Sequence, residues 1–337
     1  MNIKQVFEHL IAGNDLTGSE MEQLMQSCMR GELTDVQLGA FLALMRMKGE
    51  TVDELTAAAS TMLDFARLVD LGDDLIDIVG TGGDGKNTFN VSTVSSVVAA
   101  AAGAKVAKHG SRSVSSSSGS SDLLTQAGIR LELDEQQLQQ CIKQHNLCFL
   151  FAPHFHPALQ QAKTARQQLG VRSFFNLLGP LVNPARVKRQ VIGVFDKRWQ
   201  QPLLEVLVNL GSERCMVITS RDGLDEASIA AVSDVLEYDR GTIRQWTIEP
   251  ERYDCDHENL DAVIVDSSAK SLELINAVLA GQSGAARDIV LLNTAAALVC
   301  ADIAATMEEG VLCAADAIDS GRAKELFDRL KAFSQSL

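Results

Sequence analysis

The run Leu75-Ile-Asp-Ile-Val79 is followed directly by the glycine-rich run Gly80-Thr-Gly-Gly-Asp-Gly-Lys-Asn87. A short apolar run bounded by glycines is typical of a buried strand. Glycines in the turn after a strand let backbone N–H groups face an anion at the start of the next helix. We predict that this helix spans Ser92–Ala102 and leads to a second strand at Ala104–Ala107. This strand–helix–strand unit indicates parallel strands joined by a right-handed crossover.

The same alternation continues toward the C-terminus. Further apolar runs predict buried strands at Leu147–Phe151, Val191–Phe195 and Met216–Thr219. Helices between the strands are predicted at Glu135–Gln144, Pro157–Leu169 and Pro202–Leu210. The Ala-rich tail, Ser271–Leu337, is predicted to be helical and to cover the sheet. The chain is therefore predicted to have an α/β fold with a mainly parallel central sheet.

Residues 1–70 have a different pattern, which indicates a small bundle of helices. Three capping boxes recur, at Thr17 and Glu20, at Thr34 and Gln37, and at Thr51 and Glu54. In each box the Thr hydroxyl accepts a hydrogen bond from a first-turn N–H group, while the Glu or Gln side chain reaches back to the cap. Apolar residues between the boxes follow helical spacing. We predict an N-terminal α-helical domain whose exposed apolar faces form a dimer surface.

The composition indicates a soluble globular protein and argues against several classes of function. A length of 337 residues favours two domains. The 30 basic and 44 acidic residues give a net charge of −14, and aromatic residues make up 5%, which argues against nucleic acid or an anionic membrane as a partner. The seven cysteines form no CxxC pair, so we expect free thiols in the cytoplasm. An apolar stretch such as Val97–Ala102 is too short to span a bilayer.

Two known phosphate-binding motifs match the glycine-rich run only in part. Gly80, Gly82 and Gly85 satisfy GxGxxG, but a dinucleotide fold also needs an acidic residue about 20 residues on. No acidic residue occurs between positions 84 and 122. The run also approaches GxxxxGK[ST], but Asn87 stands where that loop has a hydroxyl residue for magnesium. What remains is a backbone cradle for phosphate at a helix N-terminus, with an ordinary tight turn as the alternative.

A second polar segment follows the second predicted strand. The run Lys108–Asp122 carries the cations Lys108 and Arg112 and many serines and glycines, whose hydroxyl and N–H groups can bind phosphate oxygens. A flexible Ser-rich linker is the alternative. Asn90, Ser92 and Thr93 add polar side chains at the start of the preceding helix. Two such loops at the carboxyl ends of adjacent strands predict a site for a doubly phosphorylated ligand.

Two further features indicate a metal ion and a second substrate. Asp225 and Glu226 follow the strand Met216–Thr219, and adjacent carboxylates there suit Mg²⁺, which normally accompanies a diphosphate. Arg166 can pair with a substrate carboxylate in a bidentate manner, with a surface ion pair as the alternative. His154 and His156 have no third ligand at metal spacing, so we do not predict a zinc site.

Together these motifs resemble those of the anthranilate phosphoribosyltransferases. They occur in the family's order as Gly80–Asp84, Asn90–Thr93, Lys108–Gly110, the serine run to Asp122, Arg166, Asn176–Pro184 and Asp225–Glu226. The resemblance implies a small α-helical domain of residues 1–70, to which residues 170–186 return. It implies an α/β domain of residues 71–169 and 187–337 that binds phosphoribosyl diphosphate. It also implies a fold shared with pyrimidine nucleoside phosphorylases and a homodimer formed through the helical domain.

The resemblance further implies a reaction of tryptophan biosynthesis. The 5-phosphoribosyl group passes from phosphoribosyl diphosphate to the amine of anthranilate, which gives N-(5-phosphoribosyl)anthranilate and diphosphate. The residues implied to hold phosphoribosyl diphosphate are Gly80, Gly83, Asp84, Thr88, Asn90, Val91, Ser92, Thr93, Lys108, His109, Gly110, Ser111, Arg112, Ser113, Val114, Ser115, Ser116 and Ser120.

The resemblance assigns the remaining roles to a few residues. Two Mg²⁺ ions would be held by Ser92, Asp225 and Glu226. Anthranilate would contact Gly80, Ser111 and Arg166, with His109 and Pro180 along its path. Lys108 and Arg166 would position the substrates, and no residue is implied as a general acid or base.

One position departs from the family pattern Lys-His-Gly-Asn-Arg, because this chain has Ser111 in place of the asparagine. Serine lacks the two-sided hydrogen bonding of an amide, so we expect weaker binding of anthranilate.

Two alternative functions remain for the chain. A pyrimidine nucleoside phosphorylase-like enzyme would need sequence motifs that bind inorganic phosphate and the nucleobase, and we do not recognise such motifs in this sequence. A nucleic-acid-binding relative of the same fold would need a basic surface, against which the net charge argues.

Overall fold

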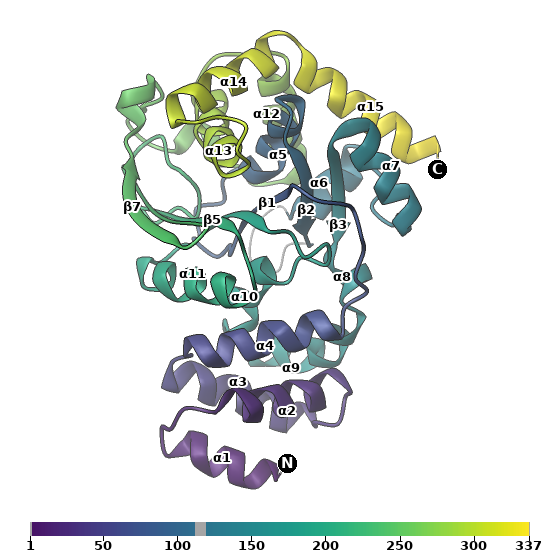
Figure 1. Cartoon of the computed structure of the whole chain (residues 1–337), viewed down its shortest axis with the longest axis vertical. Coiled ribbons are helices and arrows are strands. Elements are labelled where there is room, and N and C mark those ends of the chain that lie inside the picture. Colours follow the sequence, from purple (N-terminus) through teal and green to yellow (C-terminus); the bar gives the residue numbers. More distant parts are fainter. Residues whose placement is uncertain (1, 112–118, 337) are drawn as a thin grey trace.

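The computed structural model describes residues 2–111 and 119–336, which form a helical bundle and a larger α/β body (Figure 1). The bundle contains α1 (Ile3–Ile11), α2 (Gly18–Met29), α3 (Asp35–Lys48) and α4 (Val52–Asp64). The three predicted capping boxes are present at the starts of α2, α3 and α4, with Thr17, Thr34 and Thr51 as the caps. Each helix therefore begins where its local sequence satisfies the first N–H groups.

In the described part of the chain, one seven-stranded sheet has the strand order β3-β2-β1-β4-β5-β6-β7. The strands are β1 (Leu75–Gly80), β2 (Lys105–Gly110), β3 (Leu147–Phe151), β4 (Arg189–Gly193), β5 (Arg214–Ser220), β6 (Ser233–Asp239) and β7 (Thr242–Ile248). The pairs from β3 to β5 are parallel, and β5–β6 and β6–β7 are antiparallel. The predicted α/β fold with a mainly parallel sheet is confirmed. The chain order reverses between β1 and β4, and ligands of such sheets bind at the carboxyl ends beside a reversal of this kind.

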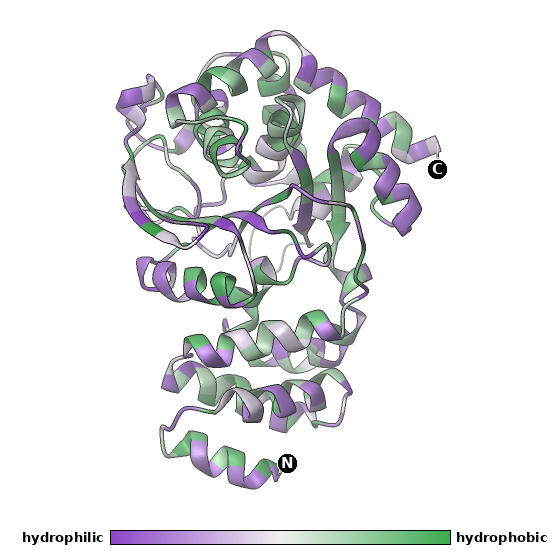
Figure 2. Ribbon diagram, in the orientation of Figure 1, coloured by the Kyte–Doolittle hydropathy of each residue, from purple (hydrophilic) through white to green (hydrophobic). Residues whose placement is uncertain are grey.

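Helices cover both faces of the sheet. The helices that follow the first four are α5 (Val91–Ala101), α6 (Ser120–Gln126), α7 (Glu135–His145), α8 (Ala152–Phe155), α9 (Lys163–Leu169), α10 (Phe175–Leu178), α11 (Gln200–Asn209), α12 (Ser268–Leu279), α13 (Ala285–Cys300), α14 (Met307–Asp319) and α15 (Arg322–Ser336). Of these, α9 packs against the bundle helix α3. Helix α13 packs against α5 and β4, whereas α11 packs against β5 and the bundle helix α4. Figure 2 shows α13 largely in hydrophobic colours and α15 largely in hydrophilic ones, as expected for a core helix and a covering helix.

Short 3₁₀ turns lie between these helices. They are η1 (Pro157–Ala162), η2 (Gly179–Leu181), η3 (Lys197–Trp199), η4 (Pro250–Tyr253) and η5 (Asp261–Val263). The single helix predicted over Pro157–Leu169 is wrong, because the segment divides into η1 and α9. Ala162 at the junction is fully buried in the bundle core, where η1 packs on α2 and α9 packs on α3. Both η1 and α9, which precede the expected segment 170–186, therefore pack against the bundle.

The hairpin of β6 and β7 was not predicted. Its outer strand is mostly polar and exposed, so it lacks the apolar run that marks the inner strands.

All seven cysteines lie in the described ranges and are free thiols, six of them buried, as predicted. Among the described residues, no helix is long and apolar enough to cross a membrane.

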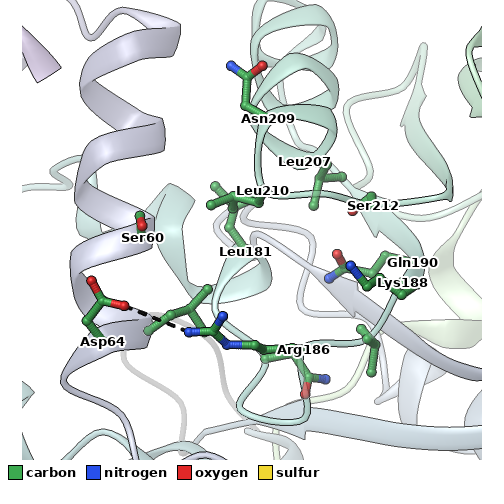
Figure 3. Close-up of a pocket in the computed structure, with 13 residues that line it drawn as sticks. Ser60, Asp64, Leu181, Arg186, Lys188, Gln190, Leu207, Asn209, Leu210 and Ser212 are labelled. Atoms are coloured by element: carbon green, nitrogen blue, oxygen red, sulfur yellow. Dashed lines mark ion pairs between the residues drawn. The ribbon is translucent and has the colours of Figure 1, made fainter. Parts of the chain in front are cut away.

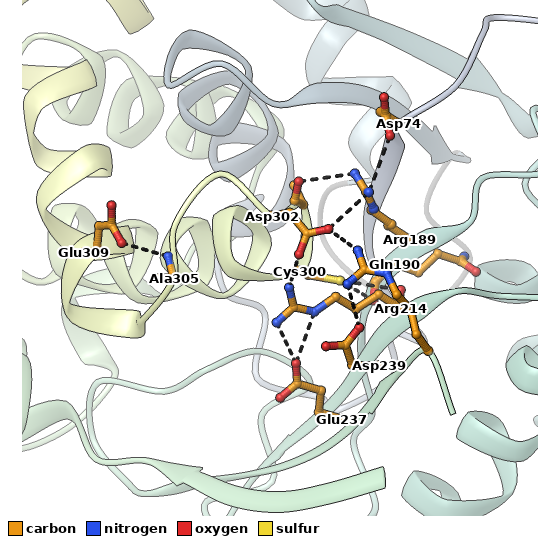
Figure 4. A network of polar contacts seen from close by, with 12 residues as sticks. Asp74, Arg189, Gln190, Arg214, Glu237, Asp239, Cys300, Asp302, Ala305 and Glu309 are labelled. Atoms are coloured by element: carbon orange, nitrogen blue, oxygen red, sulfur yellow. Dashed lines mark hydrogen bonds and ion pairs between the residues drawn. The ribbon is translucent and has the colours of Figure 1, made fainter. Parts of the chain in front are cut away.

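An ion-pair network holds the amino-terminal edge of the sheet together (Figure 4). Asp302, in the turn after α13, accepts hydrogen bonds from Arg214 of β5 and Arg240 of the β6–β7 turn. Arg189 of β4 lies 3.1 Å from the same carboxylate. Two strands and the β6–β7 turn are therefore tied to the end of α13 at this edge, and the loops at the opposite, carboxyl edge are left to form a site.

Candidate active site

Loops after β1, β4 and β5 meet at the carboxyl edge of the sheet. The loop after β5 crosses over the ends of β4 and β1, because a Cβ atom at Gly193 would overlap the backbone of Asp225 and one at Gly80 would overlap its side chain. The Gly82 N–H group donates to Asp225 Oδ2 over 2.7 Å. The Ser92 N–H group, in the first turn of α5, donates to Glu226 Oε1 over 3.1 Å. The glycine run, the start of α5 and the two predicted acids therefore form one site.

Three carboxylates crowd this site. Burial first, and then repulsion by Asp84, raise the pKa of Asp225 to about 7. Burial and the neighbouring Asp225 raise the pKa of Glu226 well above its ordinary value. Glu226 Oε2 is buried, and among the described residues it has no hydrogen-bond partner. Like charges that are buried together and left unpartnered are unfavourable unless a cation joins them.

This arrangement fits Mg²⁺ bound together with a phosphate ligand. Among the described residues, no group of three or more Asp, Glu, His or Cys side chains is placed to hold a metal alone. Mg²⁺, however, commonly takes one or two carboxylates and completes its shell with water and substrate phosphates. The unpartnered Glu226 oxygen and the Asp225 carboxylate meet that requirement, and the Ser92 hydroxyl lies in the same first turn of α5.

Lys108 brings a positive charge to the start of α5. Its buried ammonium group donates to the Ile78 carbonyl over 2.6 Å and to Ser92 Oγ over 3.2 Å. Burial lowers the pKa of Lys108, while Asp77 and Glu226 act in the opposite direction. The positive end of the α5 dipole and this cation therefore lie together, and both favour an anion at this place.

The other predicted phosphate-binding residues lie around the same edge. Asn90 caps α5 and accepts from the Ser271 hydroxyl, Thr88 forms a β-bridge with Ile264, and Val91 and Thr93 are buried. Ser111 is exposed, and its carbonyl accepts from the Ser120 hydroxyl over 3.3 Å. A Cβ atom at Gly110 would overlap that same hydroxyl. The predicted residues Arg112, Ser113, Val114, Ser115 and Ser116 lie outside the described residues.

Arg166 is a predicted contact of the second substrate, and His109 is predicted to lie along its path. Arg166 lies on α9 of the bundle side, with its guanidinium carbon 5.1 Å from the centre of the Phe175 ring. Burial lowers the pKa of Arg166, and it forms no ion pair with a carboxylate in the described part of the chain. Burial and the neighbouring His156, whose ring centre is 5.3 Å away, lower the pKa of His109 to about 3. Arg166 is therefore a half-buried cation open to a carboxylate, and His109 is a neutral side chain.

Sequence reasoning missed two contributors to the site. Asp77, inside β1, accepts from the His109 N–H group and from Asn183 Nδ2, and so holds the end of β2 and the turn after α10 in place. A carboxylate inside a buried strand is rare and could have indicated this. Arg172 donates to the Gly83 carbonyl, and nothing local in the sequence indicates that contact.

Comparison with known proteins identifies the family. The glycosyl transferase family matches with its α/β domain over residues 72–324 and with its helical bundle domain over residues 4–66. An anthranilate phosphoribosyltransferase of Legionella pneumophila (strain Paris) is 59% identical over 337 residues, which cover 100% of this chain and 98% of that protein. The chain belongs to the anthranilate phosphoribosyltransferase family.

Solved anthranilate phosphoribosyltransferases have the same fold. The enzyme of Thermus thermophilus is 36% identical and superposes with a TM-score of 0.91, covering 99% of this chain and 100% of that one. The enzyme of Saccharomyces cerevisiae, solved in complex with PRPP and Mg, is 25% identical with a TM-score of 0.89 and covers 99% and 98% of the two chains. The resemblance stated from the motifs is confirmed.

A separate cavity of about 240 Å³ lies where the bundle meets the amino-terminal edge of the sheet (Figure 3). It is lined by residues of α4, α11 and the start of β4, and none of the predicted site residues lines it. Arg186 and Asp64 face each other across its mouth at 3.8 Å, and both side chains are more than half exposed. An exposed ion pair contributes about 0–1 kcal/mol, so this pair adds little to the apolar packing of α4 against α11.

Proposed function

We propose that this chain transfers the 5-phosphoribosyl group of phosphoribosyl diphosphate to the amine of anthranilate, a step of tryptophan biosynthesis. The observation that carries the proposal is the meeting of the glycine run, the start of α5 and the Asp225–Glu226 pair at one edge of the sheet. Backbone N–H groups with adjacent carboxylates are what a magnesium-bound diphosphate requires. The family to which the chain belongs supports the same reaction.

The chain's own groups act mainly on the leaving diphosphate. When the bond from ribose C1 to diphosphate breaks, positive charge develops on the sugar and negative charge on the leaving oxygen. Lys108 stabilises that negative charge, because its ammonium group is already held at the start of α5 before the reaction. Two Mg²⁺ ions held by Ser92, Asp225 and Glu226 would supply further neutralisation when bound.

The acceptor needs orientation rather than proton transfer from a side chain. An aniline nitrogen is nucleophilic while neutral, so its attack on C1 requires no general base. Arg166 would hold the anthranilate carboxylate, so that the amine faces C1. His109, with a pKa lowered to about 3, is neutral and forms a wall of the acceptor site beside Pro180.

Arg166→Ala is expected to raise the KM for anthranilate by about 10- to 100-fold, because a charge-assisted hydrogen bond to a carboxylate is lost. The KM for phosphoribosyl diphosphate should stay within about twofold, since Arg166 lies on α9 and not on the phosphate loops. Arg166→Lys keeps the charge without the planar fork and should be intermediate. Steady-state kinetics with each substrate varied checks this, and an unchanged KM for anthranilate would rule out the assigned role.

Ser111→Asn is expected to lower the KM for anthranilate by about 3- to 10-fold, which corresponds to one additional hydrogen bond. The amide offers both a donor and an acceptor where the serine offers one hydroxyl. The same kinetic assay measures the effect. A higher KM in the variant would mean that this chain binds its acceptor in a different way from the family pattern.

We further propose that the protein is a cytoplasmic homodimer that joins through the bundle. Val36 and Met47 of α3 are 82% and 83% exposed, and Ile11 of α1 is 64% exposed. Light scattering should give twice the chain mass of 36.3 kDa. Val36→Glu with Met47→Glu should shift the protein to monomer, whereas Leu312→Glu, at another exposed position on α14, should not. A monomeric wild type would contradict this proposal.

Loss of anthranilate fluorescence on mixing with phosphoribosyl diphosphate tests the proposed reaction. We expect a loss that depends on both the enzyme and Mg²⁺ and stops when EDTA is added. No loss with enzyme that still binds phosphoribosyl diphosphate in a calorimeter would refute anthranilate as the acceptor. No binding of phosphoribosyl diphosphate would refute the donor as well.

A further inference from the structure

Arg172 connects the bundle with the glycine run. It lies between α9 and α10, and its backbone carbonyl accepts a hydrogen bond from Arg46 of the bundle helix α3. Its guanidinium group donates to the carbonyl of Gly83. The guanidinium carbon also lies 4.8 Å from the centre of the Phe195 ring, just after β4. One residue therefore joins the bundle, the end of β4 and the loop after β1.

The contact with Gly83 sets the orientation of the glycine run. In a planar trans peptide unit, the Gly83 carbonyl and the Asp84 N–H group point in opposite directions. When the Arg172 guanidinium group binds the Gly83 carbonyl, the Asp84 N–H group therefore points away from Arg172. Gly82, Gly83 and Gly85 all have positive φ. Because glycine can adopt many backbone conformations, contacts with other parts of the chain are needed to hold the run in a single conformation.

Other hydrogen bonds to the body hold the two ends of the run, where the Thr81 N–H group donates to the Gly193 carbonyl and the Asn87 carbonyl accepts from the Val265 N–H group. The Gly82 N–H group donates to Asp225, and Asp84 Oδ1 accepts from the Lys86 N–H group within the run itself. A Cβ atom at Gly83 would overlap the Arg172 guanidinium, so the two groups are in close contact. Arg172 thus contacts the middle of the glycine run, at Gly83, from the side of the bundle.

The charge of Arg172 suits a diphosphate. The side chain is half-buried, and among the described residues it forms no ion pair with a carboxylate. An aromatic ring under a guanidinium plane fixes its orientation while leaving its charge uncompensated. In a chain of net charge −14 whose site carries three carboxylates, an uncompensated cation beside the phosphate loop attracts an anionic ligand.

We propose that Arg172 is a positioning residue for the phosphoribosyl diphosphate site: it holds the Gly83 carbonyl so that the Asp84 N–H group faces the diphosphate. This inference rests on the proposed function for the identity of the ligand. Because Arg172 belongs to the segment that also carries α9 and Arg166, it joins the site of the donor to that of the acceptor.

Three variants test the inference. Arg172→Ala removes the contact, and Arg172→Lys keeps the charge and a donor but loses the planar stacking on Phe195. Arg198→Ala is the matched control, because Arg198 also lies over an aromatic ring, 5.2 Å from the centre of Trp199, on the exposed surface. Thermal unfolding of all three variants shows whether the fold is intact.

The readouts are steady-state kinetics and calorimetric binding of phosphoribosyl diphosphate with Mg²⁺. For Arg172→Ala we expect the KM and the Kd for phosphoribosyl diphosphate to rise together by about 10- to 100-fold, with kcat falling less than about tenfold. Arg172→Lys should recover part of the loss, and Arg198→Ala should match the wild type. If Arg172→Ala fails to fold, Arg172→Lys decides by the same readouts.

The outcomes separate this inference from the proposed function. Unchanged KM and Kd for phosphoribosyl diphosphate in Arg172→Ala, with an active wild type, would overturn the role of Arg172 and leave the function intact. A wild type that binds phosphoribosyl diphosphate but does not consume anthranilate would refute the function. Weaker donor binding in Arg172→Ala would then still support the role of Arg172.

Discussion

Gly193→Ala is expected to reduce phosphoribosyl transfer by at least about 100-fold, because a methyl group there displaces the acids that hold the metal. The added Cβ atom would overlap the backbone carbonyl of Asp225, and a backbone cannot rotate away as a side chain can. The loop after β5 must therefore shift, together with Asp225 and Glu226. A displacement of about 1 Å in catalytic groups costs on the order of 100-fold in rate.

Two further glycine variants sharpen this prediction. Gly80→Ala should lose less activity, because its Cβ atom would meet the Asp225 carboxylate, which can turn aside. Gly18→Ala is the control, since a Cβ atom there would meet no atom within 4 Å. Assays of kcat and of the Mg²⁺ concentration for half-maximal activity measure all three variants. Wild-type activity in Gly193→Ala would mean that the loop after β5 does not set the reaction geometry.

Asp225→Asn combined with Glu226→Gln is expected to lower kcat/KM by about 1,000-fold or more, because the amides keep the shape of the site but not the charge that binds Mg²⁺. The hydrogen bonds from the Gly82 and Ser92 N–H groups can still form to the amide oxygens. The loss should therefore reflect the metal and not a collapsed site. Activity measured across a Mg²⁺ titration checks this prediction.

The same double variant should be more stable than the wild type in Mg²⁺-free buffer near pH 8. Burial raises the pKa of Asp225 to about 7 and that of Glu226 well above its ordinary value, so both are costly to ionise without a cation. Neutral amides remove that cost. The unfolding temperature should rise without Mg²⁺, and the stabilisation that Mg²⁺ gives the wild type should disappear. The exposed Glu258→Gln should change neither property. Full activity in the double variant would show that these acids do not bind the metal.

Local patterns account for most of what could be predicted. The capping boxes at Thr17, Thr34 and Thr51 join residues three positions apart, so their hydrogen bonds depend on the local sequence and little on tertiary packing. The inner strands are short apolar runs because both of their faces are buried. The glycine run and the described start of the second polar segment lie at the carboxyl ends of β1 and β2, since parallel strands place all such ends at one edge.

What escaped prediction depends on contacts between distant residues. Gly193 lies against the backbone of Asp225, 32 residues further along the chain. A glycine inside an apolar run does not indicate this contact. The contact of Arg172 with Gly83 joins the two domains. The strand β7 pairs through its backbone, although most of its side chains are exposed. In each case tertiary packing, and not local preference, decides the structure.

The most direct test of the account is the stoichiometry of the reaction. Diphosphate released and anthranilate consumed are measured together in the presence of Mg²⁺ and phosphoribosyl diphosphate, and the product is identified by mass spectrometry. The account predicts one diphosphate per anthranilate and a product with the mass of N-(5-phosphoribosyl)anthranilate, with neither change when Mg²⁺ is removed. Release of diphosphate without consumption of anthranilate would contradict it, because the chain would then hydrolyse the donor and not transfer its phosphoribosyl group.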